Sequence, residues 1–111
     1  RILEFVDSQA GVDFPIDHEP PFMDGPALGD ENNGPIADAL VAVARKVASS
    51  SDKVGVPYGT DAATISGTGG VPSVVFGPGS IDQAHTCDEW LPLDELEQAS
   101  EVLYQFGTKG M

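Results

Sequence analysis

Basic residues are scarce in this 111-residue sequence, with five Lys and Arg against 18 Asp and Glu. The resulting net charge of −13 at pH 7 repels the phosphates of nucleic acids and of anionic lipids. We therefore expect no nucleic-acid partner and no membrane partner. The single cysteine, Cys87, has no second cysteine for an internal disulfide, which fits a reducing compartment and leads us to expect a cytoplasmic protein.

Long hydrophobic runs are absent as well. No apolar run approaches the roughly 20 residues that a membrane-spanning helix needs, and we expect no signal peptide. The sequence starts at Arg1 rather than at a methionine, and its first residues resemble the middle of a domain. We therefore expect a piece of a longer chain, with the length of one small domain or part of a larger one.

Apolar residues at helical spacing predict an amphipathic helix over residues 35–48. Pro35 fits the first turn of this helix, where a missing N–H costs little, and Asn32 or Asn33 can cap it. The stretch TDAATISG, residues 60–67, could open a second, short helix.

The two ends of the sequence also have helical patterns. A short helix near the start is expected to end at Gly11, a usual C-terminal glycine. The last helix covers residues 94–106, where Asp94 and Glu97 predict a capping pair and Gly107 closes the helix.

Extended segments separate these helices. Residues 12–23 contain three prolines, so they form an edge strand or an extended connector. The run VPSVVF, residues 71–76, predicts a central strand that is buried on both faces of a parallel sheet, and residues 53–58 form a shorter β-rich run. The loop composition of DGPALGDENNGP, residues 24–35, which follows the proline-rich segment, places a domain boundary near Asp24. Helices alternating with strands after this boundary predict an α/β layered domain.

His85 is the first candidate for chemistry. It lies in GPGSIDQAHTCDEW, after the predicted strand, with Asp82, Asp88 and Glu89 nearby. Loops at the carboxyl ends of parallel strands often bind ligands. A single histidine lacks the paired spacing of a zinc motif, however. The sequence around His85 therefore leaves two interpretations open: a metal ligand, or a solvated or capping histidine.

The other candidates have simpler explanations. GPGS at 77–80 lacks the Lys-Ser/Thr of a phosphate-binding loop, which favours a plain turn. In YGTDA, Thr60 binds a ligand or Asp61 caps the next helix, and the cap is the simpler interpretation. Cys87 is two residues from His85, too close for the two to face each other as a nucleophile and base in an extended loop.

Three motifs in order resemble a known family. GTDA at 59–62, VVFGPG at 74–79 and AHTCDEW at 84–90 before a final helix are similar to the C-terminal end of dizinc amidohydrolases of the acetylornithine deacetylase and succinyl-diaminopimelate desuccinylase type, in the M20 metallopeptidase family. The resemblance implies that residues 24–111 are the C-terminal part of a three-layer α/β catalytic domain. It also implies, more loosely, that residues 1–23 end an α+β lid domain.

The resemblance further implies a substrate, a cofactor and a site. The full-length protein would be a homodimer with two zinc ions per subunit, cobalt being possible, and would cleave an N-acyl amino acid or a short peptide. His85 would supply one metal ligand and Glu89 would hold its loop. The residues expected to bind substrate are Gly59, Thr60, Gly79 and Ser80.

The family's other metal-binding motifs are not in this sequence. The H-x-D motif and the Glu-Glu pair that supply the remaining ligands and the base are missing, so the fragment alone is expected to be inactive. The alternative is a non-catalytic acidic interaction domain or a degenerate homologue. An H-x-D motif and an adjacent Glu pair upstream of this sequence would distinguish the two.

Overall fold

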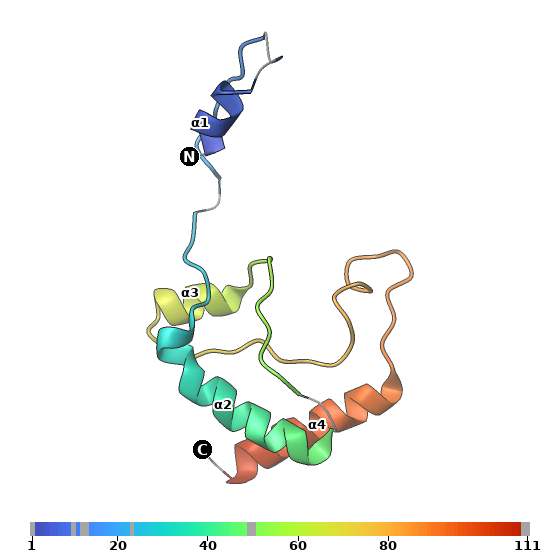
Figure 1. Cartoon of the computed structure of the whole chain (residues 1–111). Helices are drawn as coiled ribbons and strands as arrows, with labels where there is room; N and C mark the ends of the chain where they lie inside the picture. Colours follow the sequence, from blue (N-terminus) through green and yellow to red (C-terminus); the bar gives the residue numbers. More distant parts are fainter. Residues whose placement is uncertain (1, 10, 12–13, 23, 49–50, 110–111) are drawn as a thin grey trace.

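The computed structural model describes residues 2–9, 11, 14–22, 24–48 and 51–109, and in these residues the regular structure is helical (Figure 1). The four helices are α1 (Ile2–Asp7), α2 (Asp30–Val47), α3 (Asp61–Gly67) and α4 (Leu93–Lys109). The short helix that TDAATISG predicts is therefore confirmed as α3. The two long predicted helices are confirmed as α2 and α4, with different starting residues.

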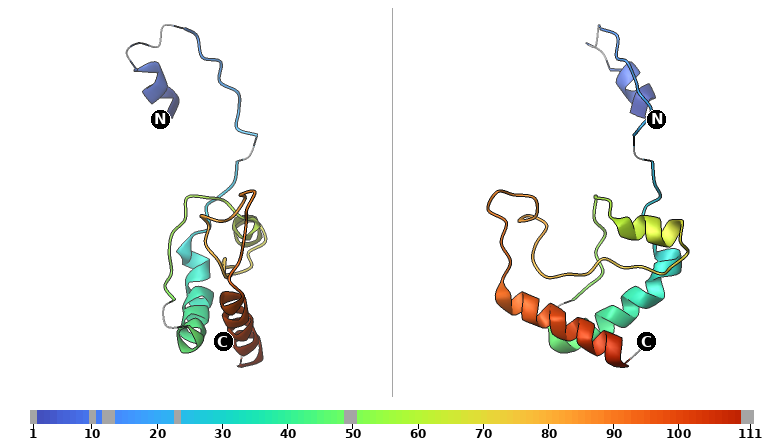
Figure 2. Two further views of the ribbon diagram at one scale, coloured as in Figure 1. Left: turned by 90° about the vertical axis from the view of Figure 1, so that its right-hand side faces the viewer. Right: turned by 180° about the vertical axis from the view of Figure 1, so that it is seen from behind.

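The core lies between α2 and α4. The C-terminal halves of these two helices pack side by side, as Figures 1 and 2 show from three directions. Leu40 and Ala44 of α2 meet Val102 of α4, which is only 2% exposed. Partly buried apolar side chains surround this centre: Val43, Val47, Val74 and Phe106.

α2 begins five residues earlier than the sequence pattern predicts. Gly29 occupies the N-cap position, and Asp30 and Glu31 form an acidic first turn, which the positive end of the helix dipole favours. Pro35 therefore lies inside the helix, and Asn33 is a buried helical residue instead of a cap. The predicted cap at Asn32 or Asn33 was wrong because the helix contains Pro35 beyond its first turn and therefore starts earlier.

α4 also begins earlier than predicted. It starts at Leu93, so Asp94 and Glu97 both lie within the helix and the predicted capping pair is wrong. Ala99 and Val102 form the buried face, with Phe106 packed against the core. The apolar spacing predicts a face of Leu96, Ala99, Leu103 and Phe106, but Leu96 and Leu103 are 43% and 54% exposed, so the buried face is rotated from the predicted one.

The predicted strands are not formed in the described residues. Residues 71–76 are extended, and no backbone hydrogen bond pairs them with another extended segment there. Val74 packs against the core, whereas Val75 is 49% exposed, so the prediction of a strand buried on both faces is wrong for this structure. Residues 53–58 likewise form no strand in the described part of the chain. A strand requires a neighbour for its N–H and C=O groups, and the α/β sheet predicted from the sequence has no second strand among the described residues.

The N-terminal arm stands apart from the helices that form the core. α1 ends at Asp7, before Gly11, and residues 14–22 run extended without a strand, which agrees with the connector interpretation. Figures 1 and 2 show this arm projecting away from α2, α3 and α4. The radius of gyration is accordingly 19.2 Å, against about 13–14 Å for a compact chain of this length. The domain boundary near Asp24 stays a prediction.

Within the described part of the chain, no helix combines the length and the apolar character that crossing a bilayer requires.

Candidate functional site

Two of the predicted substrate-binding residues line an open hollow of about 690 Å³. Gly79 and Ser80 lie on its wall, and so does Tyr58, which directly precedes the predicted pair Gly59 and Thr60. Gly59 and Thr60 themselves are not among the residues that line it, so the structure places one of the two predicted substrate-binding turns, Gly79 and Ser80, on the hollow. Its other walls are largely apolar and include Val75, Phe76, Ile81, Trp90, Leu91 and Leu96.

His85 lies in a loop of tight turns beside this hollow. The N–H groups of Gln83 and Ala84 donate to the carbonyls of Ser80 and Ile81, at 3.0 and 3.1 Å. His85 follows with φ of +61°, a left-handed conformation that is uncommon for residues other than glycine. This conformation turns the chain back after the tight turns and leaves His85 exposed. Such backbone outliers gather at functional sites, which makes His85 a site candidate on geometry as well as on motif.

Two carboxylates hold this loop through backbone amides. Glu89 Oε2 accepts the N–H of His85 at 3.2 Å, and Glu95 Oε2, from the first turn of α4, accepts the N–H of Gly79 at 2.8 Å. Glu89 thus bonds to the backbone of His85, and its role in holding the loop of a metal ligand stays a prediction. Glu95 was not singled out from the sequence. An acidic residue at a helix start usually interacts with its own helix, so the pattern gave no sign of its contact 16 residues away.

The turn before α3 carries Gly59 and Thr60. Thr60 is the N-cap residue of α3, with extended backbone angles, and its side chain makes no capping hydrogen bond. Asp61 is the first helical residue, so the interpretation of Asp61 as the cap is wrong by one position. The hydroxyl of Thr60 is half-buried and is not used by the helix, which leaves it able to donate to a ligand.

The remaining candidate residues do not assemble around His85. Cys87 is exposed, and its Sγ lies 3.9 Å from Asp88 Oδ2, a weak contact that points to no catalytic pair with His85. His18 lies 4.0 Å from Asp7 in the N-terminal arm. Across the described ranges, no group of three or more His, Cys, Asp or Glu side chains could hold a metal ion. A zinc site needs at least three protein ligands, so these residues do not form one by themselves.

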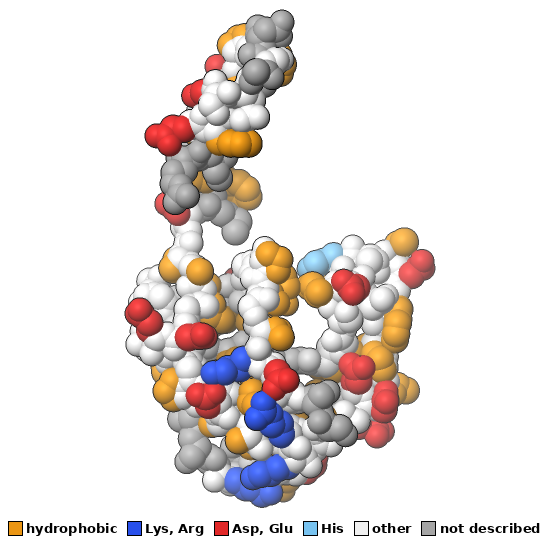
Figure 3. Space-filling view, in the orientation of Figure 1, with side chains coloured by type: hydrophobic (Ala, Val, Ile, Leu, Met, Phe, Trp, Pro, Cys, Tyr) orange, Lys and Arg blue, Asp and Glu red, His pale blue; other side chains and the backbone are white. Residues whose placement is uncertain are grey.

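The segments that line the hollow contain acidic residues and no basic residue. Residues 54–108 contain eight Asp and Glu and neither Lys nor Arg. Figure 3 shows the basic side chains gathered over the lower part of the molecule, whereas acidic and hydrophobic side chains cover the part formed by the loop before α4. This half of the chain has no cation of its own with which to bind an anionic substrate.

Comparison with known proteins gives one match. The sequence model of peptidase family M20/M25/M40 matches residues 12–109, which is most of the chain. Neither the curated proteins nor the solved structures yielded a significant match.

Proposed function

The chain belongs to peptidase family M20/M25/M40, and from this membership we propose that it forms the C-terminal part of a metal-dependent amide hydrolase. Full-length members of the family are metallohydrolases. In our proposal His85 supplies one metal ligand and the enzyme's remaining ligands come from outside residues 1–111. The proposed enzyme is a cytoplasmic homodimer of the acetylornithine deacetylase or succinyl-diaminopimelate desuccinylase type, with two zinc ions per subunit.

Family membership over residues 12–109 carries this proposal, and the geometry of the 77–90 loop supports the part that concerns His85. The loop holds His85 exposed, in a left-handed conformation, with its backbone amide bonded to Glu89. An exposed imidazole on a loop held by hydrogen bonds is able to bind a metal without rearrangement of the fold. The same loop forms one wall of the hollow, so a metal at His85 would lie close to a molecule bound there.

The negative charge of this region supports a metal cofactor for a second reason. The proposed substrate, an N-acyl amino acid or a short peptide, carries a free carboxylate. Eight acidic residues and no basic residue in 54–108 would repel it. Bound divalent cations would reverse the local potential, and the Thr60 hydroxyl would then hold the carboxylate beside them.

The hollow also fits the other parts of such a substrate. Its apolar walls suit an acyl group or an apolar side chain, and Ser80 contributes a hydroxyl there. The N–H of Gly79 already donates to Glu95, so in our proposal Gly79 shapes the turn and Ser80 provides the polar contact. The left-handed φ of +87° at Gly79 is readily adopted by a glycine alone.

The two histidines of the chain provide the test. In the enzyme that contains this chain, His85→Ala should lower kcat by more than about 100-fold, because even residues that only support a metal ligand cost about 10–100-fold when changed. His18→Ala, the matched control in the N-terminal arm, should leave kcat and zinc content unchanged. Residues 1–111 alone should neither hydrolyse N-acetyl or N-succinyl amino acids nor bind stoichiometric zinc.

Other outcomes separate this proposal from its competitor. The absence of a metal-binding cluster in the described residues is equally expected of a non-catalytic acidic domain. Full activity and full zinc content in His85→Ala would remove the assignment of His85. A full-length protein without an H-x-D motif, an adjacent Glu pair or bound metal would favour the non-catalytic domain.

A further inference from the structure

The side chain of Asn33 joins three separate segments of the chain. It is 6% exposed, on the face of α2 that meets α3. Its Nδ2 donates to the carbonyl of Gly29 at 2.6 Å, and its Oδ1 accepts both the Ser66 hydroxyl at 2.9 Å and the Ser73 N–H at 2.8 Å. One amide therefore connects α2 to α3 and to the extended segment 71–76.

These contacts determine how the amide of Asn33 is oriented. The backbone N–H of Ser73 can only donate, so the atom that it faces must be the oxygen, and the nitrogen then faces the Gly29 carbonyl. Both lone pairs of the oxygen are used. A buried amide without partners is unfavourable, and these three bonds stabilise Asn33 at its buried position.

Each segment bonded to Asn33 leads into one of the two predicted substrate-binding turns. α3, which carries Ser66, starts immediately after Gly59 and Thr60. The segment that carries Ser73 runs on into Gly79 and Ser80. Within the described residues, no other side-chain hydrogen bond joins α3 or residues 71–76 to α2.

We infer that Asn33 is a positioning residue that fixes the turn at Gly59 and Thr60 relative to the turn at Gly79 and Ser80. It does not reach the hollow itself and acts through Ser66 and Ser73. The functional consequence rests on the proposed function, since it concerns how the two turns bind one substrate. The structural consequence can be measured without any activity.

The structural test uses amide signals in ¹H–¹⁵N spectra of the 111-residue chain. Asn33→Asp removes the donor to Gly29 and buries a charge, so it should shift the signals of both turns. Asn32→Asp makes the same chemical change at the preceding, exposed position of α2 and should shift the signals of neither turn.

Ser66→Ala sharpens the test and remains usable if Asn33→Asp does not fold. It removes one bond to Asn33 and leaves the bond from Ser73 in place. The signals of Gly59 and Thr60 should therefore move while those of Gly79 and Ser80 stay. Unmoved signals at Gly59 and Thr60, or equal movement of both turns, would overturn the inference.

The functional test uses the enzyme that contains this chain. Ser66→Ala should raise KM for a substrate with a free α-carboxylate by about threefold or more, with kcat nearly unchanged, because small displacements of positioning groups weaken substrate alignment. KM for the same substrate as its amide should not change. Equal KM changes for both substrates would contradict the inference, whereas a wild-type enzyme without hydrolase activity would refute the proposed function and leave the spectra to decide on Asn33.

Discussion

The α2–α4 pair and the segments around the hollow are held together in different ways. Between the helices, small and aliphatic side chains such as Leu40, Ala44 and Val102 are buried against one another. Around the hollow, large apolar side chains remain exposed, including Trp90 at 59% and Ile81 at 54%. The hollow's segments are instead held by backbone N–H groups that donate hydrogen bonds to the side chains of Asn33, Glu89 and Glu95.

This difference predicts where mutations will act. Burial of apolar side chains is collective, so damage to the helix pair should lower the free energy of unfolding of the whole chain. A hydrogen bond contributes about 0.5–1.5 kcal/mol net, so damage around the hollow should appear mainly as local opening and changed substrate binding. Four comparisons test this division.

The largest expected effect is in the helix pair. Leu40→Ala should lower the free energy of unfolding by about 2–5 kcal/mol, because it removes a buried side chain and leaves a cavity. Leu103→Ala makes the same change at an exposed position of α4 and should cost no more than about 0.5 kcal/mol. Urea unfolding followed by circular dichroism measures both. Equal losses would show that the α2–α4 contact is not the stabilising core.

A smaller effect is expected at the turn before α3. In the enzyme that contains this chain, Thr60→Val should weaken transition-state binding by about 1–3 kcal/mol, since a charged substrate group loses its donor. Stability should hardly change, because the Thr60 side chain makes no capping bond in α3. The measurement is kcat/KM for a substrate with a free α-carboxylate and for its amide.

Thr64→Val is the matched control for this prediction. Thr64 is exposed on the same helix and takes the same substitution. It should leave kcat/KM unchanged for both substrates. If Thr60→Val reduces the two values equally, Thr60 is structural and the carboxylate is held elsewhere.

The helices could be predicted from the sequence because their signals are local. Apolar residues three and four positions apart mark α2 and α4, and TDAATISG marks α3. The start of α2 was missed because Pro35 is a common first-turn residue, and nothing nearby indicates that Asp30 begins the helix. The strand over 71–76 was wrong for a different reason. Strand formation depends on a partner segment, which the pattern of one run does not reveal.

The candidate site was predictable only in part. Family motifs pointed to His85, Thr60 and Gly79, and the structure brings Gly79 and the residue before Gly59 to one hollow. Whether His85 binds a metal stays a prediction. The sequence predicts Asn33 only as a possible helix cap, because its partners Ser66 and Ser73 lie 33 and 40 residues away in the sequence. Contacts at that separation follow from the packed structure and leave no local pattern.

The turn after residues 71–76 should show a local effect. Glu95→Ala removes the acceptor of the Gly79 N–H, and the exchange of that amide with solvent should become about threefold to tenfold faster, as expected for a lost bond of about 1 kcal/mol. Glu97→Ala, an exposed glutamate on the same helix, should not change it. Hydrogen exchange followed by NMR distinguishes the two. Faster exchange throughout α4 in Glu95→Ala would mean that Glu95 stabilises the helix and not the turn.

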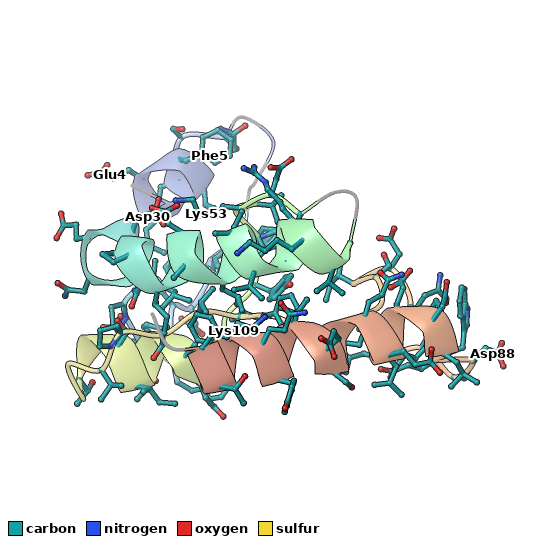
Figure 4. All side chains as sticks on the ribbon, turned by 90° about the horizontal axis from the view of Figure 1, so that it is seen from below. Glu4, Phe5, Asp30, Lys53, Asp88 and Lys109 are labelled. Carbon is teal, nitrogen blue, oxygen red and sulfur yellow. The ribbon has the colours of Figure 1, made fainter. Side chains whose placement is uncertain are left out.

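The smallest effect should come from the exposed ion pair that links α2 to the start of the 53–58 run. Lys53 Nζ lies 2.7 Å from Asp38 Oδ1, and Figure 4 shows Lys53 beside α2, near Asp30. The hydrogen bond from Lys53 to Asp38, then the charge of Asp38 and more weakly that of Asp30, raise the pKa of Lys53 above 10.5. A raised lysine pKa means that the pair stabilises the fold below pH 10.5 and that this contribution is lost as the pH rises through the folded-state value.

Asp38→Asn should therefore return the pKa of Lys53 toward 10.5, as measured by NMR titration of its side chain. The Tm at pH 7 should fall only slightly, since both side chains are largely exposed to water and salt. That small difference should shrink in high salt and again above pH 10.5, because screening and deprotonation each remove the attraction. Asp17→Asn removes the same charge from the N-terminal arm, where no ion pair of Asp17 is seen in the described residues, and should alter neither quantity. A large, salt-independent loss of Tm in Asp38→Asn would mean that this exposed pair stabilises the chain as strongly as the buried helix contacts do. The division between the two regions would then be wrong.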